Sequence, residues 1–363
     1  MKKVLLVTLF DEKNIGNRLQ NYALQRVIEG YGIGVTTLDN GYTEDPSASA
    51  RAKYAVKQML VRVGYRKYAE DCRKYRRSKG MRQVIRVFNR ENLSDVLRVT
   101  NRQAFSEDWS AYDAAVAGSD QIWHKWRSDE NELPYYYLQF MPPEKRVAYA
   151  ASFGFEAFPE KDIPLHRAGI EGMKYISCRE ESGCGLIREL TGRQVPRVLD
   201  PTLLLSAEQW RELESQARDV AKKQENYALA FFLGHTSEEY RKYMERTMKE
   251  RGVDKLIDFN GDALRECGPC EFLSLIDNAR LVFTDSFHCT VFSTIFQKDF
   301  TVFRRVQPGF EKMFGRIEDL LASTDKLDRI YGGTSAEPTN NYEQLQKDSI
   351  RYLEMILNID HEN

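Results

Sequence analysis

The sequence predicts an α/β protein of two domains, each a parallel sheet covered by helices, and three observations carry this prediction. Short apolar segments alternate with segments of helical periodicity along the chain, which is typical of parallel sheets. The chain has 363 residues, enough for two domains of about 150 residues each. The apolar segments form two groups, and the break near residues 155–175 carries Pro159, Pro164, Gly169 and Gly172.

The first domain is expected over residues 1–165. The run Val4–Phe10 follows two lysines, as the apolar part of a signal peptide would, but Asp11 and Glu12 end it without a cleavage site. We therefore interpret it as the first strand. The other candidate strands of this domain are Val35–Leu38, Ala114–Gly118 and Val147–Ala151.

A basic helical insertion is expected within this domain, at about residues 46–108. Residues 51–90 hold fourteen lysines and arginines, with Glu70 and Asp71 as the only acidic residues. The pattern fits a solvated helix pair with one buried stripe. It also fits a basic face for an acidic glycan, or for peripheral contact with the inner membrane surface. No nucleic-acid-binding motif accompanies the charge, so nucleic acid is not an expected partner.

The second domain is expected over residues 173–335, followed by a C-terminal helix over residues 341–363. Leu345, Ile350, Leu353 and Ile356 lie at helical spacing and indicate this helix. The candidate strands of the domain are Tyr175–Cys178, Arg197–Leu199, Ala228–Phe232, Leu256–Phe259, Leu281–Thr284 and Phe300–Phe303.

Composition limits the class of protein and its partners. The chain is 42% hydrophobic and 29% charged with net charge −1, which is the make-up of an ordinary globular protein. Its six cysteines do not have the spacing of a secreted disulfide framework, and no apolar run reaches the roughly 18 residues that span a bilayer. We expect a soluble, cytoplasmic protein. The five histidines lack metal-ligand spacing and no dinucleotide fingerprint is present, so neither a metal nor a cofactor is expected.

Polar residues follow the first candidate strand, at the edge where open α/β sheets bind ligands. Gly16 permits a tight turn, Asn17 is a candidate helix cap, and free backbone N–H groups there would attract an anion. Three further residues are expected to contact substrate in the crevice, although they would also suit a polar helix face: Arg18, Gln20 and Asn21.

Two further strand ends carry candidate substrate contacts. Ser119 suits a turn, and Asp120 could accept a hydrogen bond from a sugar hydroxyl or act as a base. Trp123 offers a flat face for stacking, and Ser152 lies among small residues that permit close approach of a ligand. Each of these residues also has a purely structural interpretation, as an Asx turn, a core tryptophan or close packing.

The second half carries candidates for an anion site. Arg179 follows a strand directly, where a guanidinium can bind carboxylate or phosphate, although an ion pair with Glu180 would also explain it. Asp285 ends another strand, Ser286 can cap the next helix, and His288 lies in its first turn. The helix dipole lowers the pKa of a histidine there and a bound anion raises it, which suits a general acid.

The tetrapeptide Cys267-Gly-Pro-Cys270 has the spacing of thioredoxin redox motifs. Gly-Pro is also a common sequence at the start of a helix, because proline is favoured at the first helical position. Both interpretations remain open at this point.

Taken in order, these segments resemble the polysaccharide pyruvyl transferase family. The resemblance implies two Rossmann-like domains facing each other across a cleft, as in GT-B glycosyltransferases. It also implies transfer of pyruvate from phosphoenolpyruvate to two hydroxyls of a saccharide or lipid-linked saccharide acceptor, giving a cyclic ketal and phosphate. The matching runs, over roughly residues 4–321, are GNRLQNYALQ, GSDQIW, YAASFG, SCREESG, VLDPTLLL, TDSFHCTVF and FGRIEDLL.

The resemblance also carries over donor-site residues. Arg179 matches the arginine of the family's SxRE segment and His288 the histidine of its RxH segment, so both are expected to line one cleft. His288 is expected to protonate the donor, with Asp120 or Asp285 aiding hydroxyl attack. Ser286 stands where the RxH arginine is expected, and the candidate replacements are Arg265, Arg304, Arg305, Lys312 and Arg316.

Two other functions remain open from the sequence. A GT-B-type glycosyltransferase that uses a nucleotide sugar would have the same fold and a basic crevice. A non-catalytic glycan-binding or redox-sensing relative would keep the fold without the reaction.

Overall fold

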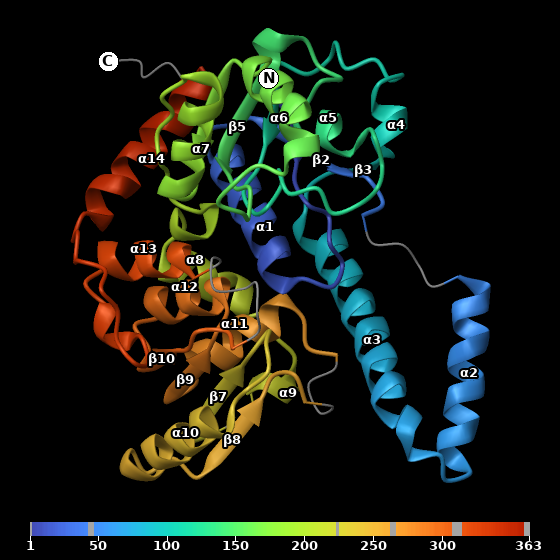
Figure 1. Cartoon of the computed structure of the whole chain (residues 1–363), viewed down its shortest axis with the longest axis vertical. Helices are drawn as coiled ribbons and strands as arrows, with labels where there is room; N and C mark the ends of the chain where they lie inside the picture. Colours follow the sequence, from blue (N-terminus) through green and yellow to red (C-terminus); the bar gives the residue numbers. More distant parts are fainter. Residues whose placement is uncertain (1, 43–46, 223–224, 262–265, 307–313, 359–363) are drawn as a thin grey trace.

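The structure is a computed structural model that describes residues 2–42, 47–222, 225–261, 266–306 and 314–358 (Figure 1). Two parallel sheets organise these residues, one in the upper and one in the lower half of Figure 1. This confirms the predicted fold class of two doubly wound α/β domains.

The first sheet has the strand order β3-β2-β1-β4-β5-β6, with every pair of neighbours parallel. In this order the direction of winding reverses between β1 and β4, and such a switch point is where doubly wound sheets bind ligands. The strands are β1 (Lys3–Val7), β2 (Gly34–Asp39), β3 (Val96–Arg98), β4 (Ala114–Ala117), β5 (Arg146–Ala151) and β6 (Tyr175–Cys178).

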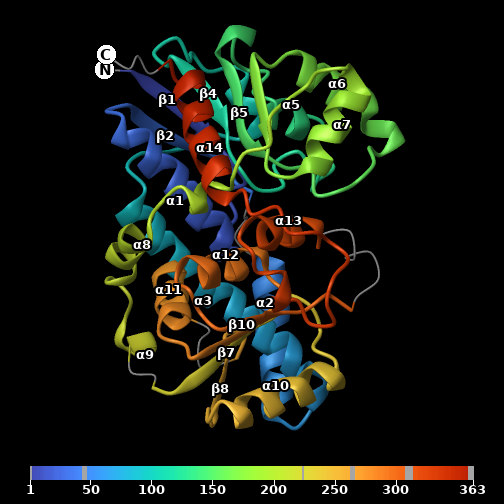
Figure 2. The ribbon, with the colours of Figure 1, turned by 90° about the vertical axis from the view of Figure 1, so that its left-hand side faces the viewer.

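Helices cover both faces of this sheet because successive residues of a buried strand point to opposite sides. Leu5 and Val7 of β1 pack beneath α5, α6 and α7, whereas Val4 and Leu6 pack beneath α1 and α14. Figure 2 shows the C-terminal helix lying across the first sheet. The helices of this half are α1 (Ile15–Gly30), α2 (Ala48–Arg62), α3 (Ala69–Asn92), α4 (Asn101–Ala104), α5 (Glu132–Tyr136), α6 (Ile163–Glu171), α7 (Glu181–Thr191) and α14 (Tyr342–Ile356).

The second sheet has the order β10-β9-β7-β8, again all parallel, and its switch point lies between β7 and β9. Its strands are β7 (Tyr227–Phe231), β8 (Lys255–Asp258), β9 (Leu281–Thr284) and β10 (Phe300–Val302). Its helices are α8 (Ala207–Glu214), α9 (Asp219–Lys222), α10 (Glu238–Glu250), α11 (Pro269–Asp277), α12 (Phe287–Ile295) and α13 (Gly315–Ser323).

The basic insertion is the crossover between β2 and β3, and it forms a helical hairpin of α2 and α3. The long helix α3 reaches from the first domain to the second (Figure 1), where Arg77 donates hydrogen bonds to the carbonyl and side-chain oxygens of Asn260. Met81, Ile85 and Phe88 of α3 join an apolar core that is continuous with the second domain. The hairpin therefore packs on both domains at its base.

Three details differ from the sequence predictions. Tyr175–Cys178, assigned by us to the second domain, is the edge strand β6 of the first sheet, because the Pro- and Gly-containing segment 163–171 is a crossover helix and not a linker. Arg197–Leu199 makes only an isolated bridge to Cys178. Val96–Arg98, inside the expected insertion, pairs with β2 as a strand. No helix in the described parts of the chain is long and apolar enough to cross a membrane.

Candidate active site

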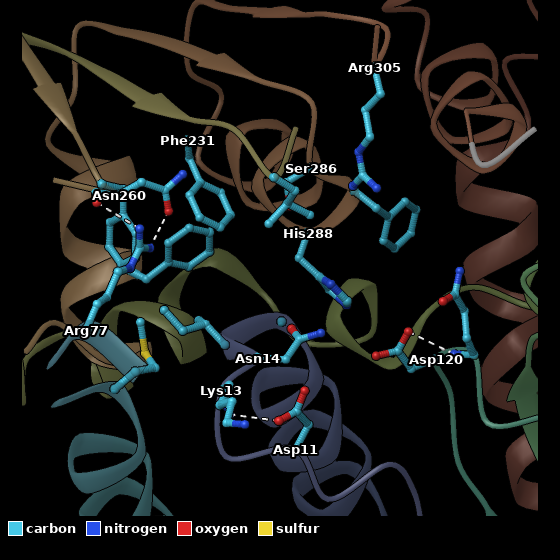
Figure 3. A pocket seen from close by; sticks show the side chains of 18 of the residues that line it. Asp11, Lys13, Asn14, Arg77, Asp120, Phe231, Asn260, Ser286, His288 and Arg305 are labelled. Atoms are coloured by element: carbon cyan, nitrogen blue, oxygen red, sulfur yellow. Dashed lines mark hydrogen bonds between the residues drawn. The ribbon is translucent and has the colours of Figure 1, made fainter. Parts of the chain in front are cut away.

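A cavity of about 330 Å³ lies between the two switch points (Figure 3). The first domain contributes residues that follow β1 and β4 and two residues of α3: Asp11, Lys13, Asn14, Ile15, Gly16, Asp120, Gln121, Arg77 and Met81. The second domain contributes residues that follow β7, β8 and β9, with residues from two further helices and a loop: Phe231, Leu233, Phe259, Asn260, Phe272, Ser286, Phe287, His288, Arg305 and Arg316. Both sheets thus present their ligand-binding edges to one space.

Two helix N-termini meet at this cavity. Asn14 caps α1 by accepting a hydrogen bond from the backbone N–H of Asn17, and Ser286 caps α12 by accepting one from Cys289. The α1 backbone at Gly16 lies so close to His288 that a Cβ at Gly16 would overlap the imidazole ring. The positive ends of two helix dipoles therefore face one space, an arrangement that favours an anion. The cap of α1 is Asn14, and our assignment of that role to Asn17 was wrong.

Asp200 is the hub of a buried polar cluster behind the cavity wall. Its carboxylate accepts hydrogen bonds from Ser119 Oγ and from Arg179 Nη1, each at 2.8 Å. His288 Nε2 lies 3.9 Å from the same carboxylate oxygen. Arg179 from the first domain and His288 from the second are thus brought to one carboxylate. We expected both to line one cleft, but only His288 lines the cavity, because the Arg179 side chain is buried beside Asp200.

Several buried polar atoms of this cluster lack a hydrogen-bond partner. They are Nε and Nη2 of Arg179, Nε of Arg316, Nε2 of His288 and Oε2 of Glu180. A buried polar group without a partner costs free energy, and native proteins leave few of them. The nitrogens of Arg179 lie 3.7 Å and 3.8 Å from carboxylate oxygens of Glu180 and Asp120. Arg316 and His288 line the cavity, and their unpartnered nitrogens are the pattern expected of a site that is completed by the oxygens of a ligand.

Cations and carboxylates are interleaved here. The guanidinium groups of Arg179 and Arg316 lie 4.8 Å and 5.5 Å from the centre of the Phe287 ring. Burial, reinforced by repulsion from Arg179, lowers the pKa of Arg316 to about 10. Arg316 therefore remains charged at neutral pH, and the neighbouring carboxylates do not fully balance its positive charge. An anionic ligand in the cavity would supply the missing negative charge.

The protonation states follow from burial and from these neighbours. Burial lowers the pKa of His288, and the attraction of Asp200 and Asp120 only partly offsets it, so the free protein holds the imidazole neutral at pH 7. Burial would raise the pKa of Asp120, but Arg179 and His288 outweigh it and the pKa is lowered. The pKa of Asp200 falls to about 2 for the same reason, because His288 and Arg179 outweigh its burial.

Most of the residues predicted from the second half come together at the cavity. Ser286, His288 and Arg316 line it, as does Asp120 from the facing wall. Arg179 is buried one layer behind, covered by Phe287 and paired with Asp200, with Asp120 at 3.8 Å. Ser119 belongs to the same layer, since it donates to Asp200.

Ser152 and Asn17 each donate a hydrogen bond to a carboxylate of the site. Ser152 donates to Glu180 at 2.6 Å and lines a smaller cavity that shares Gln121 and Arg316 with the first. Asn17 donates from its amide to Asp120 at 3.1 Å and so holds this carboxylate at the cavity. Asp120 itself has a positive φ of 74°, a strained conformation for a non-glycine residue, of the kind found at functional sites.

Besides Arg179, Ser119, Ser152 and Asn17, five further predicted contacts do not line the cavity. Arg18 is buried and donates to Leu9 and Asn21, and Gln20 and Asn21 bond within the first domain to Thr8 and Thr37. Trp123 is fully buried and stacks on Tyr137 at 5.0 Å.

Asp285 is the fifth of these residues. It accepts hydrogen bonds from the backbone N–H groups of Leu233 and Gly234 at 2.7 Å and 2.9 Å. The carboxylate thereby holds the loop after β7, and Arg305 lies 3.4 Å from it. Asp120 is the remaining candidate of the two for assisting a hydroxyl.

Two of the five replacements proposed for the missing arginine reach the cavity, namely Arg305 and Arg316. Arg304 is paired with Glu318 at 2.8 Å, away from it. Arg265 and Lys312 lie outside the described residues.

Asp200 is the central residue of the buried polar cluster and was missed by sequence reasoning, although it lies in the VLDPTLLL run, and the lining residues Lys13, Arg77 and Asn260 were missed as well. The sequence feature that could have revealed Asp200 is its position directly before Pro201. There its carboxylate caps a short helical turn by accepting a hydrogen bond from the backbone N–H of Thr202.

The thiols of Cys267 and Cys270 lack the lowered pKa that a redox-active cysteine pair has. Burial raises the pKa of both the Cys267 and Cys270 thiols to about 12, whereas a reactive thiol has a lowered pKa. Gly268 between them lies against Val84 of α3, where a Cβ would overlap the valine side chain. The motif therefore serves close packing between α11 and the hairpin.

Comparison with solved structures places this architecture in a known class. The UDP-GlcNAc 2-epimerase of Neisseria meningitidis, solved with UDP-GlcNAc, has a TM-score of 0.50 at 10% identity, covering 99% of this chain and 100% of that chain. The MnaA protein of S. aureus, solved with UDP, has a TM-score of 0.50 at 9% identity, covering 100% and 99%. These likenesses show a shared fold, the GT-B type with two Rossmann-like domains.

The sequence gives the particular family. The profile of the family "Polysaccharide pyruvyl transferase" matches residues 14–305, and the chain belongs to this family. A comparison with curated protein sequences found no match. The protein is thus an enzyme of the pyruvyl transferase kind, as its motifs predicted.

Proposed function

We propose that the enzyme transfers pyruvate from phosphoenolpyruvate to two hydroxyls of a saccharide acceptor, forming a cyclic ketal and releasing phosphate. The observation that carries the proposal is the pair of unpartnered nitrogens of Arg316 and His288, which line the cavity beside two helix N-termini. Phosphoenolpyruvate has a phosphate and a carboxylate, and both kinds of donor suit such groups.

The donor lies between the two domains in this proposal. Arg316 and the N-terminus of α12 bind one anionic group, and the N-terminus of α1 binds the other. Arg179 acts from behind the wall, where its charge offsets Asp120 and Asp200. The neutral His288 of the free enzyme gains a proton when the donor's negative charge arrives, because a nearby anion favours the imidazolium.

The reaction then proceeds in two steps at C2 of the donor, an addition followed by a displacement. His288 donates a proton to C3, which becomes the methyl group, and C2 takes on cationic character. The first acceptor hydroxyl forms a bond to C2 and its proton passes to Asp120. The second hydroxyl forms another bond to C2 while the bond from C2 to the phosphate oxygen breaks, and phosphate leaves with the remaining proton.

The test is incubation of the enzyme with phosphoenolpyruvate and a panel of saccharide precursors, following phosphate release and the mass of the saccharide. We expect phosphate only when an acceptor is present, with a saccharide product heavier by one pyruvate ketal. Loss of His288 as the acid should cost about 10²–10⁴ in rate, so His288→Gln should be slower by this factor.

Binding separates this proposal from nucleotide-sugar transfer. We expect phosphoenolpyruvate to raise the melting temperature of the enzyme and Arg316→Gln to abolish the shift. Stabilisation by UDP- or GDP-sugars in place of phosphoenolpyruvate would contradict the proposed donor. Met355→Ser, on the exposed face of α14, is the matched control and should leave the shift unchanged.

A further inference from the structure

The helical hairpin carries an unusual amount of exposed apolar surface. Three large apolar side chains of α2 and its cap are more than half exposed: Val56 at 60%, Met59 at 68% and Val63 at 64%. No other described helix carries more than one exposed large apolar residue. With Ala52, these side chains recur at spacings of four, three and four residues, so they form one stripe along the helix.

This stripe faces away from the rest of the protein. No residue of α2 is buried, and the contacts of α2 with α3 are on its other side, where Tyr54 stacks on Tyr75 at 4.0 Å and Lys57 forms an ion pair with Asp71. Figure 1 shows α2 beside α3, on the side away from the second sheet. The apolar stripe is therefore left uncovered by the described chain.

Basic residues flank the stripe. Residues 48–79 contain eleven lysines and arginines against two acids, and both acids are paired within the hairpin, Asp71 with Lys57 and Glu70 with Lys74. On a helical projection of 100° per residue, Lys53 lies on one border of the stripe and Arg62 on the other. The chain as a whole has net charge −1, so the remainder of the molecule is acidic.

We propose that α2 and the turn after it form a docking surface for an anionic lipid bilayer. An apolar stripe bordered by lysine and arginine suits the interface plane, where the stripe enters the acyl boundary and the cations meet the headgroups. A second copy of the hairpin would bring like charges together along both borders. The acidic body is repelled by the same surface, which orients the molecule with the hairpin toward the lipid.

This surface adjoins the cavity. Arg77 and Met81, on the helix that pairs with α2, line the cavity wall, and Figure 3 shows Arg77 entering the site from this helix. A bilayer bound at α2 would therefore lie beside the active site. The proposal stands independently of the identity of the donor.

The experiment is co-sedimentation of the full chain with vesicles of phosphatidylcholine and phosphatidylglycerol, compared with phosphatidylcholine alone. We expect binding to the anionic vesicles only, weakened by salt because screening shortens the range of the surface charges. The variant Val56→Ser/Met59→Ser/Val63→Ser should bind roughly tenfold more weakly, since it loses the inserted side chains.

The matched control is Leu97→Ser/Leu256→Ser/Met355→Ser, which removes three exposed large apolar side chains elsewhere and should bind as the parent does. The charge variant Lys53→Gln/Arg62→Gln/Arg66→Gln should also lose binding to anionic vesicles. Circular dichroism and the thermal shift with phosphoenolpyruvate should be the same for all variants, so a failure of either proposal can be told from a failure of the other.

Three outcomes would overturn the proposal. The first is parent protein that fails to bind anionic vesicles, including the case in which it binds soluble heparin, which would assign the basic surface to an acidic polymer. The second is an apolar-stripe variant that binds vesicles as tightly as the parent. The third is a parent dimer that becomes monomeric in the stripe variant, which would assign the stripe to self-association.

Discussion

At the scale of single residues, the site depends on charges that are buried before any ligand binds. Arg179 is the clearest case, because burial would lower its pKa but Asp200, Glu180 and Asp120 raise it, so it stays charged. Asp200 is ionised for the complementary reason. The pair positions a fixed positive charge behind the cavity without exposing it to solvent.

The pH dependence of the reaction follows from His288. Its pKa in the free protein is lowered below 6.5 by burial, so the protonated form is lost as pH rises through that lower value. A bound anion raises the pKa again. We expect kcat/KM, which reports the free enzyme, to fall at lower pH than kcat, which reports the complex.

The measurement is phosphate release at limiting and at saturating phosphoenolpyruvate across the pH range. His288→Gln provides the control, because phosphoenolpyruvate itself titrates near neutrality. An alkaline decline that survives unchanged in His288→Gln would show that the ligand, and not the histidine, is being titrated.

At the scale of elements, the approach of α1 to α12 sets the geometry of the site. Gly16 lies against the His288 ring, so Gly16→Ala must displace either the imidazole or the helix. We expect it to lower the free energy of unfolding by about 1–3 kcal/mol through overpacking. The rate should fall by about 10²-fold, since a shift of roughly 1 Å at a catalytic group has that effect.

Gly30→Ala is the matched control in the same helix, because a Cβ at Gly30 meets no atom within 4 Å. It should leave both the unfolding free energy and the rate of phosphate release close to those of the parent. Equal behaviour of the two variants in chemical denaturation and in turnover would contradict the close contact between the two helices.

Sequence periodicity predicted most of these elements. The strands before the polar turns were found because buried parallel strands are short apolar runs, and the polar residues after them mark the ligand-binding edge. β6 was assigned to the wrong domain because Pro164 and Gly169 lie inside a helix, Pro164 in its first turn, where proline is tolerated. β3 was missed because its three residues are exposed and lack an apolar run.

The site was predicted less completely than the strands. His288, Asp120 and Arg316 reach the cavity, but Arg18 and Trp123 do not, since a residue list cannot show which face of a helix or turn is covered. Asp200 was missed because its partners, Ser119, Arg179 and His288, come from three separate segments. Only the folded chain reveals that these residues share one carboxylate.

At the scale of the whole molecule, the proposed donor lies between the domains and should hold the first turns of α1 and α12 together. We expect phosphoenolpyruvate to slow amide hydrogen exchange at the first turns of α1 and α12 together, because one ligand engages both N-termini. Sulfate at the same concentration is the control and should protect less, as it lacks the second anionic group. Protection confined to one of the two helices would contradict a donor shared between domains.

The chain crosses between the domains twice, and the two crossings lie side by side. Tyr342 and Gln346 of α14 both donate to the carbonyl of Leu203, and the backbone N–H of Leu199 donates to Ser349 at 2.8 Å. The two adjacent crossings fix the register of the halves along one line, and the apolar core that α1 and α3 share with the second domain holds the halves together beside that line.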